Sequence, residues 1–421
     1  MCAVLLACPL VRFAGAENKS GRLEQYICSA FNARKSREGV SGRLLSSELF
    51  TAADKGGETA ASSSYSDWMA FAMARYSVVY GSGTEYLYDE DYSAYLGALE
   101  SYVKTNYEKN SGLLSASKPT EWHRCILALT ALGGEPESFS EYCGGKINMI
   151  ADSSYNSLVR PQRQGLNGVI FALISSNIKD FQKPSNAKYS DRSFIEYILS
   201  RQTADGGWAM LSSAADADIS AMAIQALTPF YSSDTVYNIS NVKTGEQQSL
   251  SVKQAVDRAL SCLSAMQKGS GGFVSWGSEN AESVAQVIIA LTGLGIDIES
   301  DSRFIKNGST LLDALLSYRL SDGSFTHSFS ADAENPAAEP GEYSYMATDQ
   351  AAMALVSYWR YINGLNPLYN LRPDSVNEQP LPQGLLQALE ELMNRILQAL
   401  RLFCDRLRYI LVPNAQNGVV L

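Results

Sequence analysis

"QTADGGWAMLSSAADADISAMAIQAL" (residues 202–227) joins two features that recur along the chain. Its first part, 202–209, turns on Asp-Gly-Gly and then places a tryptophan. Its second part, 216–227, begins with Asp-Ala-Asp and continues as an apolar run rich in alanine. Glycine adopts the positive φ that ends a helix, and Asp is a favoured helix N-cap. The stretch is therefore typical of a turn that leaves one helix and starts another.

Alanine-rich apolar segments like 216–227 occur six times in the chain. Each has the length of a short helix, is apolar on nearly all sides, and is opened by a polar residue suited to N-capping. Six copies of one helical unit predict a repeat architecture in which neighbouring units share a core. One alanine in each segment marks the equivalent position: Ala74, Ala128, Ala172, Ala226, Ala290 and Ala354.

Amphipathic stretches lie between the alanine-rich segments, and their apolar residues recur every three or four positions. That period predicts helices with one buried face. Fully apolar helices alternating with one-sided helices predict an all-α fold, an α/α toroid with six inner and six outer helices over residues 17–370. An open α-solenoid is the alternative, but irregular spacing and six copies favour closure. The clearest amphipathic stretches are 92–107, 192–202, 252–267 and 309–320.

Three turns share a pattern, because 202–209, 267–276 and 319–327 each place an aromatic residue after glycine or Asp-Gly. Gln-x-x-Asp-Gly-Gly-Trp at 202–208 resembles the QW-type repeat of the squalene cyclase and protein prenyltransferase superfamily. The repeats over roughly 60–370 are similar to the prenyltransferase-like repeat proteins of bacterial surfaces, which are related in fold to the intrinsic factor and transcobalamin α-domain. This resemblance implies the toroid, whereas activity must be argued from the site.

The Asp-Ala-Asp run at 216–218 raises the question of catalysis. Class II terpene cyclases protonate an alkene or epoxide with the middle acid of Asp-x-Asp-Asp, so the resemblance implies Asp218 as a proton donor. Ile219 stands where that family has its last Asp, which removes one group that would stabilise the anion. The competing interpretation is that Asp216 and Asp218 are helix caps or ligand contacts. We favour this second interpretation.

Aromatic residues at loops and helix starts extend the candidate site. Aromatic faces attract cations, although packing in the core or in a turn is the competing interpretation for each of them. Together with the acidic candidates, the expected ligand-binding residues are Asp216, Asp218, Trp68, Trp122, Trp208, Trp276, Tyr345 and Asp349.

Composition excludes several functions. A formal charge of −10 and the absence of a basic stripe argue against nucleic acid as a partner. His123 and His327 stand far apart, and the chain has neither an HExxH nor a CxxC spacing, so we predict no metal. The zinc site and basic diphosphate patch of a protein prenyltransferase have no match either, and no cofactor is predicted.

The two ends of the sequence carry separate expectations. Residues 1–16 resemble the later half of a secretory signal peptide, which predicts an extracellular or cell-surface location in a bacterium; a short buried apolar segment is the alternative. A Pro-rich linker is predicted over 371–384 and an amphipathic helix over 385–412. Three interpretations of that helix stay open: packing on the toroid, oligomer or partner coiled coil formation, and membrane association.

These observations lead to one functional hypothesis and two alternatives. We expect a secreted or cell-surface toroid that is not catalytic and binds a small-molecule or protein ligand at its central cavity or the mouth of that cavity. The first alternative is an isoprenoid cyclase of the class II type, with Asp218 as proton donor. The second is an extracellular scaffold that presents the C-terminal helix.

Overall fold

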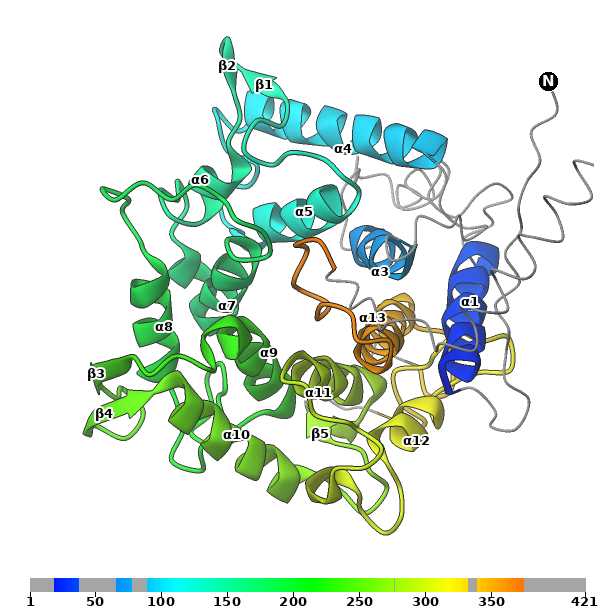
Figure 1. Cartoon of the computed structure of the whole chain (residues 1–421). Helices are drawn as coiled ribbons and strands as arrows, with labels where there is room; N and C mark the ends of the chain where they lie inside the picture. The colour runs from blue at the N-terminus through cyan, green and yellow to red at the C-terminus, as the bar shows by residue number, and fades with distance from the viewer. Residues whose placement is uncertain (1–18, 38–65, 78–88, 276, 332–338, 375–421) are drawn as a thin grey trace, which may run out of the picture. The chain divides into compact units, whose positions relative to one another are not determined.

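Helices dominate the described chain (Figure 1), which confirms the prediction of a helical protein. The computed structural model describes residues 19–37, 66–77, 89–275, 277–331 and 339–374. The helices are α1 (Lys19–Arg37), α3 (Asp67–Ser77), α4 (Asp89–Lys109), α5 (Thr120–Ala131), α6 (Met149–Ser153), α7 (Gly165–Ser175), α8 (Asp191–Leu199), α9 (Ala217–Leu227), α10 (Val252–Met266), α11 (Ala281–Gly293), α12 (Leu311–Leu316) and α13 (Tyr345–Ile362), with 3-10 turns at Pro161–Gln164, Thr228–Phe230 and Ser302–Phe304.

Strands of the described chain form three separate antiparallel hairpins. Five-residue strands occur only in the middle hairpin, between α9 and α10, where alternate residues Tyr237 and Ile239 are buried. The sequence analysis did not predict this hairpin. The strands are β1 (Glu141–Tyr142) with β2 (Gly145–Lys146), β3 (Val236–Ser240) with β4 (Gln247–Ser251), and β5 (Val274–Ser275) with β6 (Ser278–Glu279).

The helices of the unit that ends at Asp374 lie in two layers (Figure 1). We call α3, α5, α7, α9, α11 and α13 the inner helices. Each packs against the next one in the chain, and α13 packs against α3. The outer helices cover them: α1 packs on α13, α4 and α6 on α5, α8 on α7, α10 on α9, and α12 on α11.

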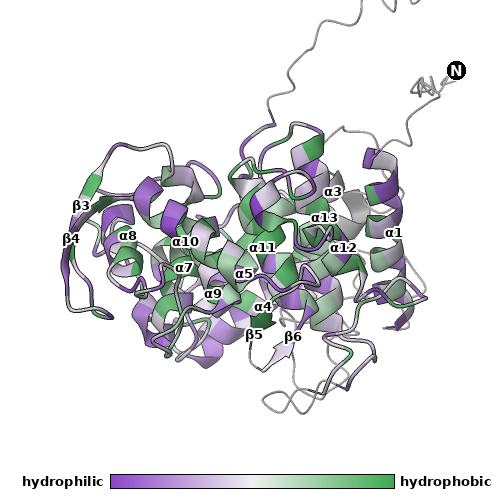
Figure 2. Cartoon of the chain, turned by 90° about the horizontal axis from the view of Figure 1, so that it is seen from below, coloured by the Kyte–Doolittle hydropathy of each residue, from purple (hydrophilic) through white to green (hydrophobic). Residues whose placement is uncertain are grey.

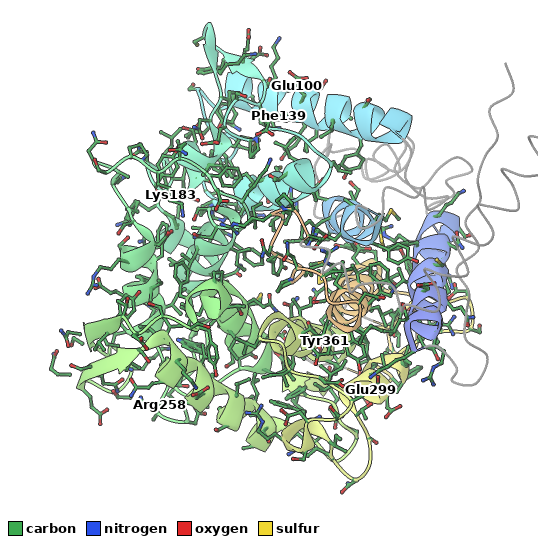
Figure 3. All side chains as sticks on the ribbon, in the orientation of Figure 1. Glu100, Phe139, Lys183, Arg258, Glu299 and Tyr361 are labelled. Carbon is green, nitrogen blue, oxygen red and sulfur yellow. The ribbon has the colours of Figure 1, made fainter. Side chains whose placement is uncertain are left out.

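Burial explains why the two layers differ in sequence. Every residue from Ala281 to Thr292 in inner helix α11 is buried, whereas outer helix α10 buries one face and leaves Arg258 exposed. Apolar residues accordingly gather on α11 and α13 in Figure 2. The side chains of Glu100 on α4 and Arg258 on α10 lie at the periphery in Figure 3. Apolar burial between the layers is the main source of stability.

The predicted Gly-containing turns fasten one outer element to the next. The Gln202 amide Nε2 donates to the carbonyl oxygens of Gly206, at 2.7 Å, and Ala255 of α10, at 2.8 Å. Gln267 repeats the arrangement one turn later, donating to Gly271, at 2.9 Å, and Phe304, at 3.0 Å. A buried amide that satisfies two carbonyls holds the turn in register with its neighbour.

Glycine is required in these turns because backbone approaches it closely. Gly206 has a φ of +94°, and a Cβ there would lie 3.1 Å from the carbonyl oxygen of Arg258. Gly323 has the same φ, and its Cβ would lie 2.9 Å from the carbonyl oxygen of Ser29 in α1. The last described turn therefore packs on the first described helix, as the earlier turn packs on α10.

A segment that follows α13, residues 366–374, crosses the C-terminal ends of the inner helices; we call it the strap (Figure 1). Arg75 of α3 donates to the strap carbonyls of Leu368, at 2.9 Å, and Asn370, at 2.8 Å. Arg360 of α13 donates to the Asp374 carboxylate at 2.6 Å and to the carbonyl oxygen of Arg75 at 2.7 Å. These two buried arginines clamp the strap to the helix ends.

Two sequence expectations need comment here. The polar N-caps occur at α9, α11 and α13, but α5 and α7 begin without a capping side chain of their own. The Thr120 amide of α5 instead donates to Gln164 Oε1 at 2.9 Å, a residue 44 positions later. The segments 1–16, 375–384 and 385–412 and the side chain of Trp276 lie outside the described residues.

Candidate functional site

Asp216 is the N-cap of α9. Its backbone is extended, with φ −111° and ψ 140°, and its Oδ1 accepts a hydrogen bond from the Ile219 amide at 3.0 Å. The second oxygen, Oδ2, accepts from the Ser275 hydroxyl at 2.6 Å. Both oxygens of Asp216 are therefore engaged in starting α9 and in holding strand β5 against it.

Asp218, the second residue of α9, is not a cap. Its Oδ1 is buried and accepts no hydrogen bond from a described residue, and Ser283 and Ser275 are its side-chain partners. Burial raises the pKa of Asp218 to about 7, helped by the charges of Asp216 and Glu282 and opposed by the two serines. The carboxyl group is therefore protonated in about half of the molecules near neutral pH.

Glu282 holds in α11 the place that Asp218 holds in α9, since both are the second residue of their helix. Glu282 Oε2 lies 2.8 Å from His327 Nδ1. The His327 carbonyl in turn accepts from the Ala281 amide at 2.9 Å, which fixes the histidine beside the start of α11. We call the group Asp216, Asp218, Ser275, Glu282 and Ser283 the mouth.

Two other aspartates on inner helices have arginine partners. Asp67 of α3 receives Arg124 Nε at 2.9 Å. Asp349 of α13, a predicted ligand-binding residue, receives Arg34 Nε at 3.0 Å, and both groups are buried. The ion pairs formed within the described residues do not include Asp218. Its proton therefore does the work that an arginine does for the other two, because it removes the charge from a buried position.

The mouth continues along one face of α9 and α11. Asp218, Met222 and Gln225 are spaced by four and three positions, so they share one face of α9. The Gln225 amide Nε2 donates to Gln286 Oε1 of α11 at 2.9 Å, and Gln286 Nε2 donates to Gln350 Oε1 of α13 at 2.9 Å. A chain of three amides thus joins neighbouring inner helices beyond the mouth.

The aromatic candidates divide into two groups. The rings of Trp68, on α3, and Phe171, on α7, lie 5.8 Å apart, although α5 packs between their helices in the circuit. The half-buried Tyr345 lies under the Arg34 guanidinium, 5.7 Å from it. Trp68 and Tyr345 are therefore partly accessible, on inner helices, in positions from which an aromatic face could contact a ligand.

Trp122 and Trp208, the other described tryptophans of the predicted set, are fully buried. The indole N–H of Trp122 donates to the Tyr107 hydroxyl at 2.8 Å, and that of Trp208 donates to the Ile198 carbonyl at 2.8 Å. A buried indole with a satisfied N–H is a packing residue. Burial therefore favours the packing interpretation over ligand contact for these two side chains.

Sequence reasoning missed Ser275, Ser283 and Glu282. A signal for Glu282 was present, because Asn280-Ala281-Glu282 lies as far before Ala290 as Asp216-Ala217-Asp218 lies before Ala226. Aligning the repeats at these alanines brings the two acidic residues to the same position. The serines carry no such signal, since their role depends on how strand β5 meets α9.

Metal and membrane chemistry have no visible site here. Within the described residues, no three His, Cys, Asp or Glu side chains gather as ligands for a metal ion. None of the described helices combines the length and the apolar character that a bilayer span requires.

Comparison with known proteins yields two distant structures. The chain is similar to ent-copalyl diphosphate synthase from Streptomyces platensis, with 15% identity and a TM-score of 0.43 over 70% of this chain and 50% of that one. It is also similar to a possible GH105 family member from Salmonella enterica serovar Paratyphi A, with 12% identity and a TM-score of 0.40 over 86% and 99%. The chain spans half the length of the first. No family model and no curated protein matches it.

Proposed function

We propose that residues 17–370 form an α/α toroid of six inner and six outer helices, followed by a linker over 371–384 and an amphipathic helix over 385–412. Two observations support the toroid. Packing runs from α3 through each inner helix to α13 and back to α3, and the 319–327 turn packs on α1 through Gly323. A solenoid would leave its first and last repeats without this contact.

We further propose that the protein is a binding protein, not an enzyme, and that its ligand is a small organic cation held at the mouth. The observation that carries the proposal is the buried Oδ1 of Asp218, which accepts no hydrogen bond from a described residue. A buried oxygen without a donor costs free energy that a ligand N–H would recover.

Charge selects the ligand class. Asp216, Asp218 and Glu282 converge at the mouth, and their mutual repulsion contributes to the raised pKa of Asp218. An ammonium ion bound there would replace the proton of Asp218 and relieve the repulsion. The partly exposed Trp68 and Tyr345 supply aromatic faces elsewhere on the inner helices, where cations are also attracted.

Benzylamine and the neutral benzyl alcohol are matched probes for this site. We expect benzylamine to bind more tightly at about pH 8 than at about pH 6, because Asp218 ionises between these values. Benzyl alcohol should bind weakly at both. Isothermal titration calorimetry of the full chain measures both affinities.

Two matched variants locate the binding. Asp218→Asn should weaken benzylamine about tenfold or more at pH 8, which corresponds to roughly 1.4 kcal/mol or more. Asp180→Asn is the control, since Asp180 is exposed beside Arg372 of the strap. Equal affinity for the amine and the alcohol, or an Asp218→Asn variant that binds benzylamine like the wild type, would overturn the proposal.

An isoprenoid cyclase remains the second candidate, and one observation favours it. Asp218 stands at the family's proton-donor position and carries a proton near neutral pH. Ile219, however, is buried and brings no carboxyl group to the site. Incubation with squalene and with geranylgeranyl diphosphate tests this candidate. A cyclised product that disappears in Asp218→Asn would reverse our ranking, whereas unchanged substrate supports binding alone.

Location and the C-terminal helix complete the proposal. We propose export to the cell surface, with cleavage after Ala16; N-terminal sequencing of the secreted chain tests this. We propose that the helix over 385–412 packs on the toroid, and a scaffold that presents this helix to a partner is the remaining alternative. Deleting residues 379–421 should then lower the solubility of the toroid. A soluble monomer after deletion, with a dimeric full-length chain in sedimentation, would favour the scaffold.

A further inference from the structure

The strap and the C-terminal ends of α9 and α11 surround a cavity of about 210 Å³. Its walls are mainly apolar and include Ile289, Leu368 and Tyr369. Apolar cavities of roughly 150 Å³ can bind benzene, so this one has room for a somewhat larger molecule. It lies beside Gln225 near the end of α9, whereas the mouth lies beside Asp218 at the start of that helix.

Gln225 supplies a polar atom at this cavity. Its side chain is 5% exposed, and its Nε2 donates both to the Gln286 carbonyl and to Gln286 Oε1, each at 2.9 Å. These two acceptors fix which end of the amide is the nitrogen. The opposite atom, Oε1, is buried and accepts no hydrogen bond from any described residue. A buried acceptor in this position favours a ligand that brings a donor.

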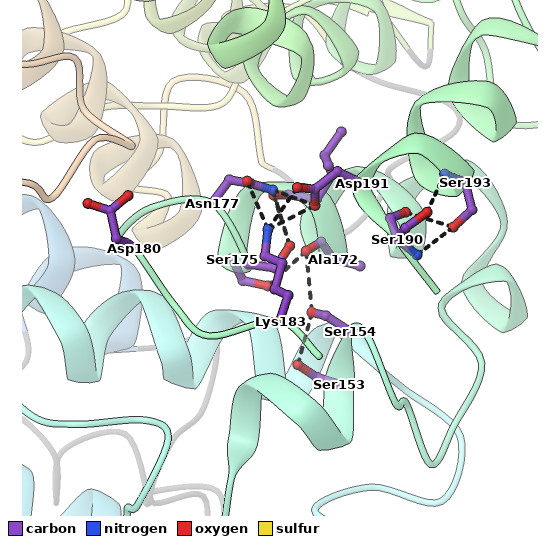
Figure 4. Close-up of polar contacts among 12 residues, drawn as sticks. Ser153, Ser154, Ala172, Ser175, Asn177, Asp180, Lys183, Ser190, Asp191 and Ser193 are labelled. Carbon is purple, nitrogen blue, oxygen red and sulfur yellow. Dashed lines mark hydrogen bonds and ion pairs between the residues drawn. The ribbon is translucent and has the colours of Figure 1, made fainter. Parts of the chain in front are cut away.

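The neighbouring polar groups of the wall already have partners. Asn177 Nδ2 donates to Asp191 at 3.0 Å and its Oδ1 accepts from Lys183 at 2.9 Å (Figure 4). The Thr228 hydroxyl donates to the Ile224 carbonyl at 2.9 Å. Gln225 Oε1 therefore differs from the side chains around it, because its hydrogen-bonding capacity is left for something outside the protein.

The remaining wall suits a flat ligand. Tyr369 of the strap stacks on Phe71 of α3, with ring centroids 5.6 Å apart and planes at 17°. Ile289 and Gly293, spaced by four positions, present one face of α11 to the cavity. Gly293 keeps this wall low, since it has no side chain.

We propose that this cavity, which we call the strap cavity, binds a small flat apolar molecule that carries one N–H or O–H group. The donor meets Gln225 Oε1, and the apolar body contacts Ile289, Leu368 and Tyr369. The site is separate from the mouth and takes a different class of ligand, a neutral molecule instead of a cation.

Indole and benzofuran are the probes, because they have nearly the same shape and differ in the N–H donor. Ligand-observed NMR with the full chain measures both affinities, and nuclear Overhauser contacts to the Ile289 methyl groups locate the bound molecule. We expect indole to bind at least about tenfold more tightly than benzofuran, as a hydrogen bond to a buried acceptor predicts.

Three variants test the assignment. Gln225→Met keeps the apolar shape and removes Oε1, so indole should fall to the affinity of benzofuran. Gln350→Met is the matched control, because it breaks the same chain of amides without lining the cavity. Gly293→Leu should abolish binding of both probes; a Cβ there meets Thr228 at an ordinary 3.7 Å, so the helix has room for the change.

The outcomes separate cleanly. Indole that binds no better than benzofuran, contacts elsewhere than Ile289, or unchanged binding in Gln225→Met would overturn the proposal, and so would the absence of binding of either probe, which would mean that water alone meets Gln225. Asp218→Asn should leave indole binding unchanged. This result distinguishes a failure of the strap cavity from a failure of the cation site at the mouth.

Discussion

The two ends of the inner helices are built from opposite charges. Carboxyl groups gather at the N-terminal ends, with Asp218 and Glu282 as second residues of α9 and α11. Arginines gather at the C-terminal ends, where Arg75 and Arg360 hold the strap. Helix dipoles favour this distribution, since the N-terminus of a helix attracts negative charge and the C-terminus positive charge.

The ends differ in how completely the charges are satisfied. Strap carbonyls and Asp374 accept the hydrogen bonds of both arginines, so charge at this end holds the fold together. At the mouth, Asp218 has two serines and no arginine or lysine among its described partners, and it keeps a proton instead. The same electrostatic preference therefore produces a clamp at one end and, in our proposal, a binding site at the other.

The largest predicted effect concerns the clamp. Replacing Arg360 by Met removes the partner of the nearly buried Asp374 and leaves the Arg75 carbonyl without its donor. We expect the free energy of unfolding in urea to fall by about 3 kcal/mol, as for other buried pairs that lose one partner. Arg372→Met is the control; it loses a pair with the 82% exposed Asp180, and we expect about 1 kcal/mol or less. Similar losses in both variants would contradict the clamp.

The next effect is the pH dependence that Asp218 imposes. Its folded pKa of about 7 exceeds the unfolded value of about 3.9, so between these pH values the folded state binds more protons. The stabilising contribution of the proton is full below about pH 4 and is lost as pH rises through 7. Asp218→Asn, which cannot ionise, should remove this slope. Between about pH 5 and pH 8 the wild type should lose about 2 kcal/mol relative to the variant, with partial exposure of the carboxyl taken into account.

Urea unfolding of both proteins at several pH values measures this difference. Parallel curves for wild type and Asp218→Asn would show that the mouth holds an ordinary ionised carboxylate. The contrast between the two ends of the inner helices would then be one of charge sign alone.

The smallest effect separates capping from charge at the mouth. Asp216→Ala should lower the free energy of unfolding by about 1 kcal/mol, because the Ile219 amide loses its cap. Asp216→Asn should keep most of that stability, since Asn is an equally good cap, and should lower the pKa of Asp218 by removing a neighbouring charge. Chemical denaturation and NMR titration of Asp218 measure the two quantities. Equal stability losses in the two variants would count against the capping role.

Local patterns predicted the helices and turns because these depend on residues close in sequence. Alanine-rich runs predicted the inner helices, and Gly-containing turns such as 202–209 follow outer helices as expected. The β3–β4 hairpin was missed because its alternating pattern covers only Val236–Ser240 and the partner strand is polar. Interactions between distant residues were beyond such reasoning. Gln164 caps α5 from 44 positions away, and the chain from Gln225 to Gln350 depends on how three helices are rotated.

Contacts between α1 and the last described helix also determine when the protein can finish folding. The ion pair of Arg34 with Asp349 joins positions 315 residues apart, and Gly323 meets Ser29 across nearly the same distance. Such distant contacts form late, because a long stretch of chain must first be ordered. During synthesis, α1 must wait with its apolar face uncovered until α13 has left the ribosome. The first helix made is therefore the last to find its partner, and a chain interrupted before α13 would expose the surface most prone to aggregation.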